Sequence, residues 1–186
     1  MALSAAAYQY SVDGGLNLLV RENGLLENGQ LVFVFASLIV FAISGIKFEG
    51  PVRTAARAMA GVCLMCFYRE IDLRSADVPG WVGAATGSPI RDIVMVAMGL
   101  AILGYVFRCR AHVRDWLHML LRFNSWPLIV SGALLFIAAM LDNKFVTSDA
   151  GRFWEELTEL IGYILLLEAS WRHMLVGRSG KAYEAG

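Results

Sequence analysis

The chain has 186 residues, of which 58% are hydrophobic and 17% charged, and its sixteen basic residues balance its sixteen acidic ones. This balance excludes a basic nucleic-acid-binding domain, and the apolar excess is well above that of a soluble globular protein. Three cysteines are too few for a disulfide framework. The composition therefore predicts an integral membrane protein with the lipid bilayer, and no nucleic acid, as a partner.

The N-terminal segment, residues 1–28, is predicted to lie at the outer membrane surface. Residues 1–12 lack the positive charge of a signal peptide, and Asp13 with the two glycines after it interrupts any apolar run. Residues 15–27 place two leucines and a valine near one helical face. That spacing is typical of an interfacial amphipathic helix.

Five apolar segments follow in chain order and predict membrane-spanning helices. They cover residues 30–46, 54–68, 93–107, 126–141 and 157–176. Some are shorter than the roughly 20 residues that cross a bilayer core, but arginines at their ends extend them by snorkelling. The alternation of a barrel strand is absent from these segments, so helices are expected. The predicted fold is all-α, a single polytopic transmembrane helical bundle of residues 1–186 with a cytoplasmic tail at 177–186.

Shorter features add detail to this bundle. Residues 108–123 predict a basic amphipathic helix on the cytoplasmic surface, where anionic headgroups attract it. Gly99 and Gly104 are predicted helix-contact positions in the third span. Cys63 and Cys66 are predicted as small packing residues.

The basic residues set the expected orientation. Ten of the sixteen fall in one set of connections: Lys47, Arg53, Arg57, Arg108, Arg110, Arg114, Arg122, Arg172, Arg178 and Lys181. The positive-inside rule places this set in the cytoplasm. The N-terminus is then periplasmic and the C-terminus cytoplasmic, in a bacterial inner membrane.

Most acidic residues fall on the opposite side. Twelve of the sixteen precede the first span or lie in the outer connections: Asp13, Glu22, Glu27, Glu70, Asp72, Asp77, Asp92, Asp142, Asp149, Glu155, Glu156 and Glu159. Glu155 and Glu159 are four residues apart, so they share a helix face and repel each other. A charge at a span end is costly unless it is paired, solvated or bound to a cation. We therefore expect these side chains to converge on a polar site.

Two plainer interpretations stay open for individual acids. Glu155 and Glu156 suit the first turn of the last span, where acidic side chains complement the helix dipole. Glu70 and Asp72, beside arginines, suit a solvated rim that marks the water boundary. Glu159 lies one turn deeper and fits the dipole interpretation poorly. Inside the last span, Glu168 and Arg172 are spaced for an ion pair.

The predicted site residues have three roles. General acid or base chemistry is assigned to Glu70, Asp72, Glu155 and Glu159. Binding is assigned to Glu22, Glu27, Gln30, Arg69, Arg91, Asp142 and Glu156. A divalent cation (Ca²⁺, Mg²⁺ or Mn²⁺) is assigned to Glu27, Glu70, Asp142, Glu155 and Glu159, because the outer face offers oxygen ligands without histidine or cysteine.

Three short motifs carry a resemblance. E-N-G-L-L-E-N-G-Q precedes the first span, R-E-I-D follows the second, and E-E-L-T-E opens the last. Their order resembles a pattern in small polytopic inner-membrane proteins of bacteria, over about thirty residues spread along the chain. The resemblance implies that these acidic positions act as a set. It implies no particular activity.

The sequence thus predicts a membrane-embedded enzyme or binding protein whose acidic site opens to the periplasm. Its substrate would be lipid-linked or a small polar molecule. The alternative is a non-catalytic subunit, with a membrane-protein partner or a second copy of the chain, or a small transporter. Transport is less favoured because the mid-membrane region offers few polar groups beyond Ser37, Ser131 and Glu168.

Overall fold

The computed structural model describes residues 25–71, 90–121, 125–142 and 149–179, and no strand occurs among them. Six α-helices account for nearly all of these residues. They are α2 (Leu25–Lys47), α3 (Gly50–Glu70), α5 (Ile90–Arg108), α6 (Arg110–Leu121), α7 (Trp126–Asp142) and α8 (Asp149–Ser179). The all-α prediction is confirmed, and each of the five apolar segments lies within one helix.

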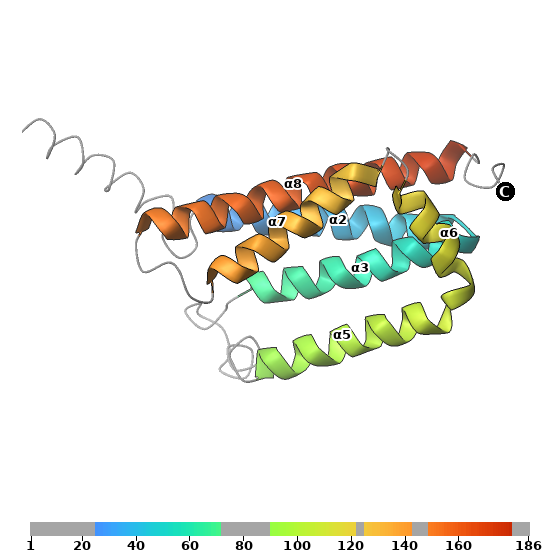
Figure 1. Ribbon diagram of the computed structural model, residues 1–186, viewed down its shortest axis with the longest axis horizontal. Helices are drawn as coiled ribbons and strands as arrows, with labels where there is room; N and C mark the ends of the chain where they lie inside the picture. The colour runs from blue at the N-terminus through green and yellow to red at the C-terminus, as the bar shows by residue number, and fades with distance from the viewer. Residues whose placement is uncertain (1–24, 72–89, 122–124, 143–148, 180–186) are drawn as a thin grey trace, which may run out of the picture.

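The five long helices run alternately up and down along a common direction, and α6 lies across one end (Figure 1). Because the long helices alternate in direction, the last residue of one helix lies at the same end of the bundle as the first residue of the next long helix. One end, here called the acidic end, holds Leu25, Glu70, Ile90, Asp142 and Asp149. The other, the basic end, holds Lys47, Gly50, Arg108, Trp126 and Ser179.

The centre of the bundle is built on α2, which packs against α3 on one side and α8 on the other. Their shared core contains Val34, Phe41, Ala56, Cys63, Tyr163 and Leu166. α7 packs on α8, and α5 packs on α3. Cys63 is fully buried and Cys66 packs against this core, so both cysteines are the packing residues that the sequence predicts.

A tight turn connects α2 to α3 and uses the backbone freedom of one glycine. Gly50 has φ 60°, a left-handed conformation that favours glycine, and a proline follows it in the first turn of α3. Arg57 donates from Nε to the carbonyl of Gly45, and Arg53 to that of Phe48, each at 2.9 Å. These bonds satisfy carbonyls that the end of α2 would leave unpaired.

No residue of α5 is buried, whereas α2, α3, α7 and α8 each contain buried residues. The large apolar side chains of α5 are mostly exposed: Ile93 67%, Val96 63%, Leu100 64%, Leu103 65% and Phe107 71%. Gly99 and Gly104 have open space where a Cβ would stand. The prediction that they are helix-contact positions is therefore wrong within this chain. The close approach between α3 and α5 occurs at Gly61 of α3, which faces Ile102 of α5.

Two described helices, Leu26–Lys47 and Ile90–Arg108, are long and apolar enough to cross a membrane, and Trp126–Leu141 is apolar but shorter. α3 and α8 are also long, but the charged residues that they carry make them less apolar. The predicted outer helix at 15–27 falls almost wholly outside the described residues. α6 occupies the predicted 108–123 segment, and its place at a membrane surface stays a prediction.

Candidate functional site

A group of polar side chains is packed between three helices near the acidic end. α2 supplies one residue, α3 two and α8 three. We call this group the polar cluster: Gln30, Arg69, Glu70, Glu156, Glu159 and Tyr163. The cluster lies between packed helices, where a buried polar group is costly unless it is hydrogen-bonded. Its internal hydrogen bonds and ion pairs therefore determine its chemistry.

Arg69 joins the last turn of α3 to α8. Its Nη2 lies 2.8 Å from Oε1 of Glu70 and also pairs with Oε1 of Glu159. Its Nε donates to the same Glu70 oxygen at 3.0 Å. The Glu70 and Glu159 side chains are 10% and 8% exposed, against 35% for Arg69. One guanidinium therefore holds two buried carboxylates together, each as a charge-assisted pair.

Tyr163 extends this network into the core. Its hydroxyl donates to Oε1 of Glu70 at 2.8 Å, and the side chain is 1% exposed. Tyr163 is four residues beyond Glu159, so the two share one face of α8. Glu70 Oε1 thus accepts from Nε and Nη2 of Arg69 and from Tyr163. A carboxylate oxygen with such donors is fixed in place and compensated for its burial.

Gln30 joins α2 to α8 on the neighbouring side of the cluster. Its side chain is completely buried, and its Nε2 donates to the backbone carbonyl and to Oε2 of Glu156, each at 2.9 Å. Both partners are oxygens, which fixes the amide with its nitrogen toward Glu156. Oε1 of Gln30 is then a buried acceptor with no hydrogen-bond partner among the residues that the structure describes. An unsatisfied buried acceptor is costly and requires an explanation.

Five of the residues predicted for the site are brought together in this cluster: Gln30, Arg69, Glu70, Glu156 and Glu159. Glu22 and Asp72 lie outside the described residues, as does the side chain of Asp142 at the end of α7. Glu27, Arg91 and Glu155 lie in the first or second turn of their helices at the same end. Glu27 and Glu155 each have an interaction of their own.

The predicted divalent-cation site is not supported. Among the side chains that the structure describes, no group of three or more His, Cys, Asp or Glu residues is placed to hold a metal ion. Of the five predicted ligands, Glu70 and Glu159 do meet, but Arg69 stands between them. The positive charge that the sequence analysis assigned to a metal is supplied by a guanidinium. Glu27 and Glu155 do not complete a ligand set there, and the side chain of Asp142 lies outside the described residues.

Tyr163 is the member of the cluster that the sequence analysis missed. The signal was present, because a tyrosine one turn beyond Glu159 on the same helix face is placed to donate to a buried acid. Nearer the C-terminal end of α8, Arg172 Nε lies 2.7 Å from Oε1 of Glu168, which confirms the predicted ion pair. That pair is half-exposed and separate from the polar cluster.

Comparison with known proteins adds no assignment to this geometry. No family model matches the sequence, and neither a curated protein nor a solved structure matches it.

Proposed function

We propose that the chain is a membrane-embedded binding protein of five spans, which takes up a small polar molecule at the polar cluster on the outer side of a bacterial inner membrane. The single observation that carries the binding role is the cluster itself. It combines a guanidinium shared by two nearly buried acids with a buried acceptor that has no partner in the described part of the chain.

The distribution of apolar surface supports the membrane environment. Large apolar side chains are exposed along α2, α5, α7 and α8, including Val32, Leu100, Phe136 and Ile164. In water such a surface would be a large unpaired apolar patch, whereas lipid tails cover it without cost. Helix α5 has no buried residue, so it most clearly needs lipid around it.

Exposed tryptophans support the proposal that α8 spans the membrane, although its charged residues make this helix less apolar than α2, α5 and α7. Trp154 is 62% exposed near one end of the helix, and Trp171 is 49% exposed near the other. Seventeen residues of helix separate them by roughly 26 Å, close to the thickness of a bilayer core. Arg172 lies over the ring of Trp126 at 5.7 Å, so a third tryptophan shares the depth of Trp171. Exposed tryptophans at two such depths are typical of membrane interfaces.

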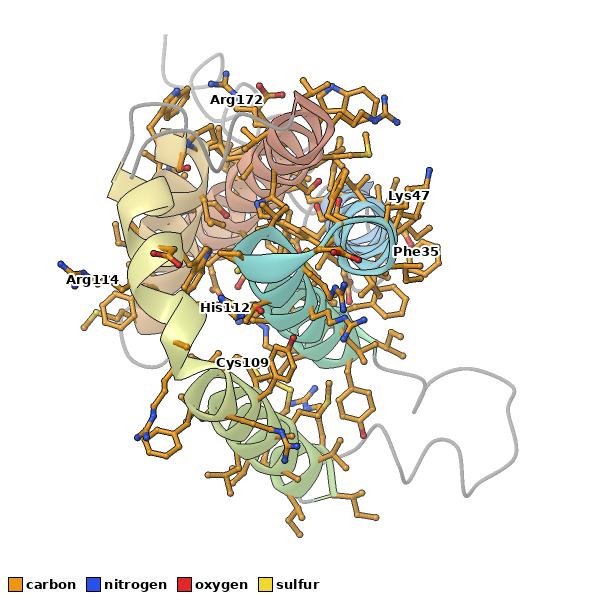
Figure 2. The ribbon with its side chains drawn as sticks, turned by 90° about the vertical axis from the view of Figure 1, so that its right-hand side faces the viewer. Phe35, Lys47, Cys109, His112, Arg114 and Arg172 are labelled. Atoms are coloured by element: carbon orange, nitrogen blue, oxygen red, sulfur yellow. The ribbon has the colours of Figure 1, made fainter. Side chains whose placement is uncertain are left out.

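The charges at the two ends support the orientation. Figure 2 looks onto the basic end, where Lys47, Arg114 and Arg172 point away from the bundle axis. The polar cluster lies toward the opposite end of the bundle (Figure 1). By the positive-inside rule the basic end faces the cytoplasm, and the cluster then faces outward.

Binding is better supported than catalysis or transport. The two acids assigned to acid–base chemistry, Glu70 and Glu159, are both held in ion pairs with Arg69, so each already has a fixed partner. Deeper in the bundle, the buried hydroxyls of Ser37 and Ser44 donate to carbonyls of their own helix at 2.8 Å. They are therefore already satisfied and offer no polar path for a transported ion.

A ligand screen on detergent-purified protein tests this proposal. Four classes of small molecule (amines, carboxylic acids, sugars and phosphates) would be compared by their effect on the melting temperature. A ligand that binds the folded state raises it. We expect one class to do so, and expect Glu159→Gln to reduce the shift.

Glu168→Gln is the matched control for this screen, because it also removes an arginine-paired acid from α8 but lies outside the cluster. It should leave the shift unchanged. A melting temperature that no class raises would contradict a binding role and leave the cluster as a structural link between helices.

A further inference from the structure

Gln30 Oε1 restricts the ligand of the polar cluster to molecules that donate a hydrogen bond. The amide cannot turn over to satisfy this oxygen, because its nitrogen already serves two acceptors on Glu156. The residue is 0% exposed, so bulk water does not reach it. A partner for this oxygen must carry an N–H or O–H group.

The charges around this acceptor restrict the ligand further. Glu70 and Glu159 share the guanidinium of Arg69, so among the described side chains of the cluster the carboxyl groups outnumber the guanidinium groups. Glu159 and Glu156 are three residues apart on one face of α8, which places the Gln30 amide next to these carboxyl groups. A neutral donor would satisfy the oxygen, and a cationic donor would also pair with a carboxylate.

We propose that the polar cluster binds a protonated primary amine, whose ammonium group donates to Oε1 of Gln30. The inference rests on the binding role proposed above and names its ligand class. An ammonium carries three donors and one positive charge, which suits a site of one amide oxygen beside carboxylates. The amine is either a free small molecule or the headgroup of an aminophospholipid, since both present the same group.

Two cations of equal charge distinguish hydrogen-bond donation to Gln30 Oε1 from electrostatic attraction to the carboxylates. Purified protein would be titrated with ethanolamine hydrochloride and, in parallel, with tetramethylammonium chloride, which has no N–H donor. We expect ethanolamine to raise the melting temperature at millimolar concentration and tetramethylammonium to leave it unchanged. Equal shifts from both cations would overturn the hydrogen-bond role of Gln30.

Gln30→Met tests the residue itself, because it keeps the length of the side chain and removes the amide. We expect the apparent affinity for ethanolamine to fall about tenfold or more, as hydrogen bonds to a charged group are among the stronger ones. Ser37→Ala is the matched control, since Ser37 is equally buried on α2 but bonds to its own helix. An unchanged affinity in Gln30→Met would contradict the proposal.

The source of the amine is resolved in nanodiscs. Phosphatidylethanolamine and phosphatidylcholine have the same net charge, but the second lacks N–H donors. A higher melting temperature in phosphatidylethanolamine, lost in Gln30→Met, indicates a lipid headgroup. A response to free ethanolamine in phosphatidylcholine discs indicates a soluble amine.

The outcomes also separate this inference from the function it rests on. If another chemical class raises the melting temperature and amines do not, the amine inference fails and the binding role stands. If no class does so in detergent or in nanodiscs, both fail.

Discussion

At the scale of single residues, Arg69 has the largest expected effect on stability. It supplies the positive charge for Glu70 and Glu159, which are both nearly buried. Removing one partner of a buried ion pair leaves an uncompensated charge, which typically costs about 3–5 kcal/mol. We expect Arg69→Met to lower the free energy of unfolding by this order, measured by denaturant or thermal unfolding in detergent.

Arg172→Met is the matched comparison. Arg172 also pairs with a glutamate and lies over a tryptophan ring, but its partner Glu168 is 47% exposed. Exposed pairs and exposed cation–π contacts each contribute about 1 kcal/mol or less. A loss in Arg69→Met no larger than that in Arg172→Met would show that the cluster is solvated and that Glu70 and Glu159 do not depend on Arg69.

The two acids of the cluster should also depend on each other. Because Glu70 and Glu159 share one guanidinium, Glu70→Gln and Glu159→Gln should show a coupling energy of about 0.5–3 kcal/mol in a double-mutant cycle. The measurement is the free energy of unfolding of the two single variants, the double variant and the wild type. Effects that add to within the error would instead describe two acids that are solvated separately.

At the scale of helices, glycines distinguish tight packing from open surface. A Cβ at Gly162 would lie 2.9 Å from Cδ2 and 3.0 Å from Cγ of Leu135, whereas Gly104 has nothing within 4 Å. Overpacking typically costs about 1–3 kcal/mol, and alanine favours an exposed helix by up to about 1 kcal/mol. We expect Gly162→Ala to lower the melting temperature and Gly104→Ala to keep or raise it. The reverse order would contradict the packing of α7 on α8.

The positions of the helices are largely predictable from the sequence, whereas the length of α8 is not. The apolar run 157–176 predicts a span, but α8 is the longer Asp149–Ser179. Acidic residues such as Glu155 and Glu156 end an apolar run and yet are favourable in the first turns of a helix. The glycine prediction for α5 was wrong because small residues permit close contact without showing which neighbour is present.

The candidate site was predictable in its residue types and less so in its bonding. Spacing and depth group Gln30, Arg69, Glu70 and Glu159, and a ligand set made only of oxygens predicts a divalent cation, whereas Arg69 is the cation that pairs with both acids. Which cation offsets buried acids depends on side-chain geometry across helices α3 and α8. That information is absent from the local sequence pattern around each acid.

At the scale of the whole molecule, two arrangements of the helices in the membrane predict different topologies. In one, α2, α3, α5, α7 and α8 all cross the bilayer. In the other, crossing is limited to Leu26–Lys47 and Ile90–Arg108, the two helices that are long and apolar enough by composition. Both accommodate the same described helices, so the side of the membrane on which each connection lies distinguishes them.

Single-cysteine labelling with a reagent that does not cross the membrane measures this directly. The variants Glu49→Cys, Ala84→Cys, Ala111→Cys and Thr147→Cys would be compared in cells, in a chain whose three native cysteines are replaced. Five spans with the polar cluster outward predict labelling at positions 84 and 147 and protection at 49 and 111. Two spans would give positions 49 and 84 one behaviour and 111 and 147 the other. Labelling at 49 and 111 with protection at 84 and 147 would place the cluster in the cytoplasm, and either of these results would contradict the account.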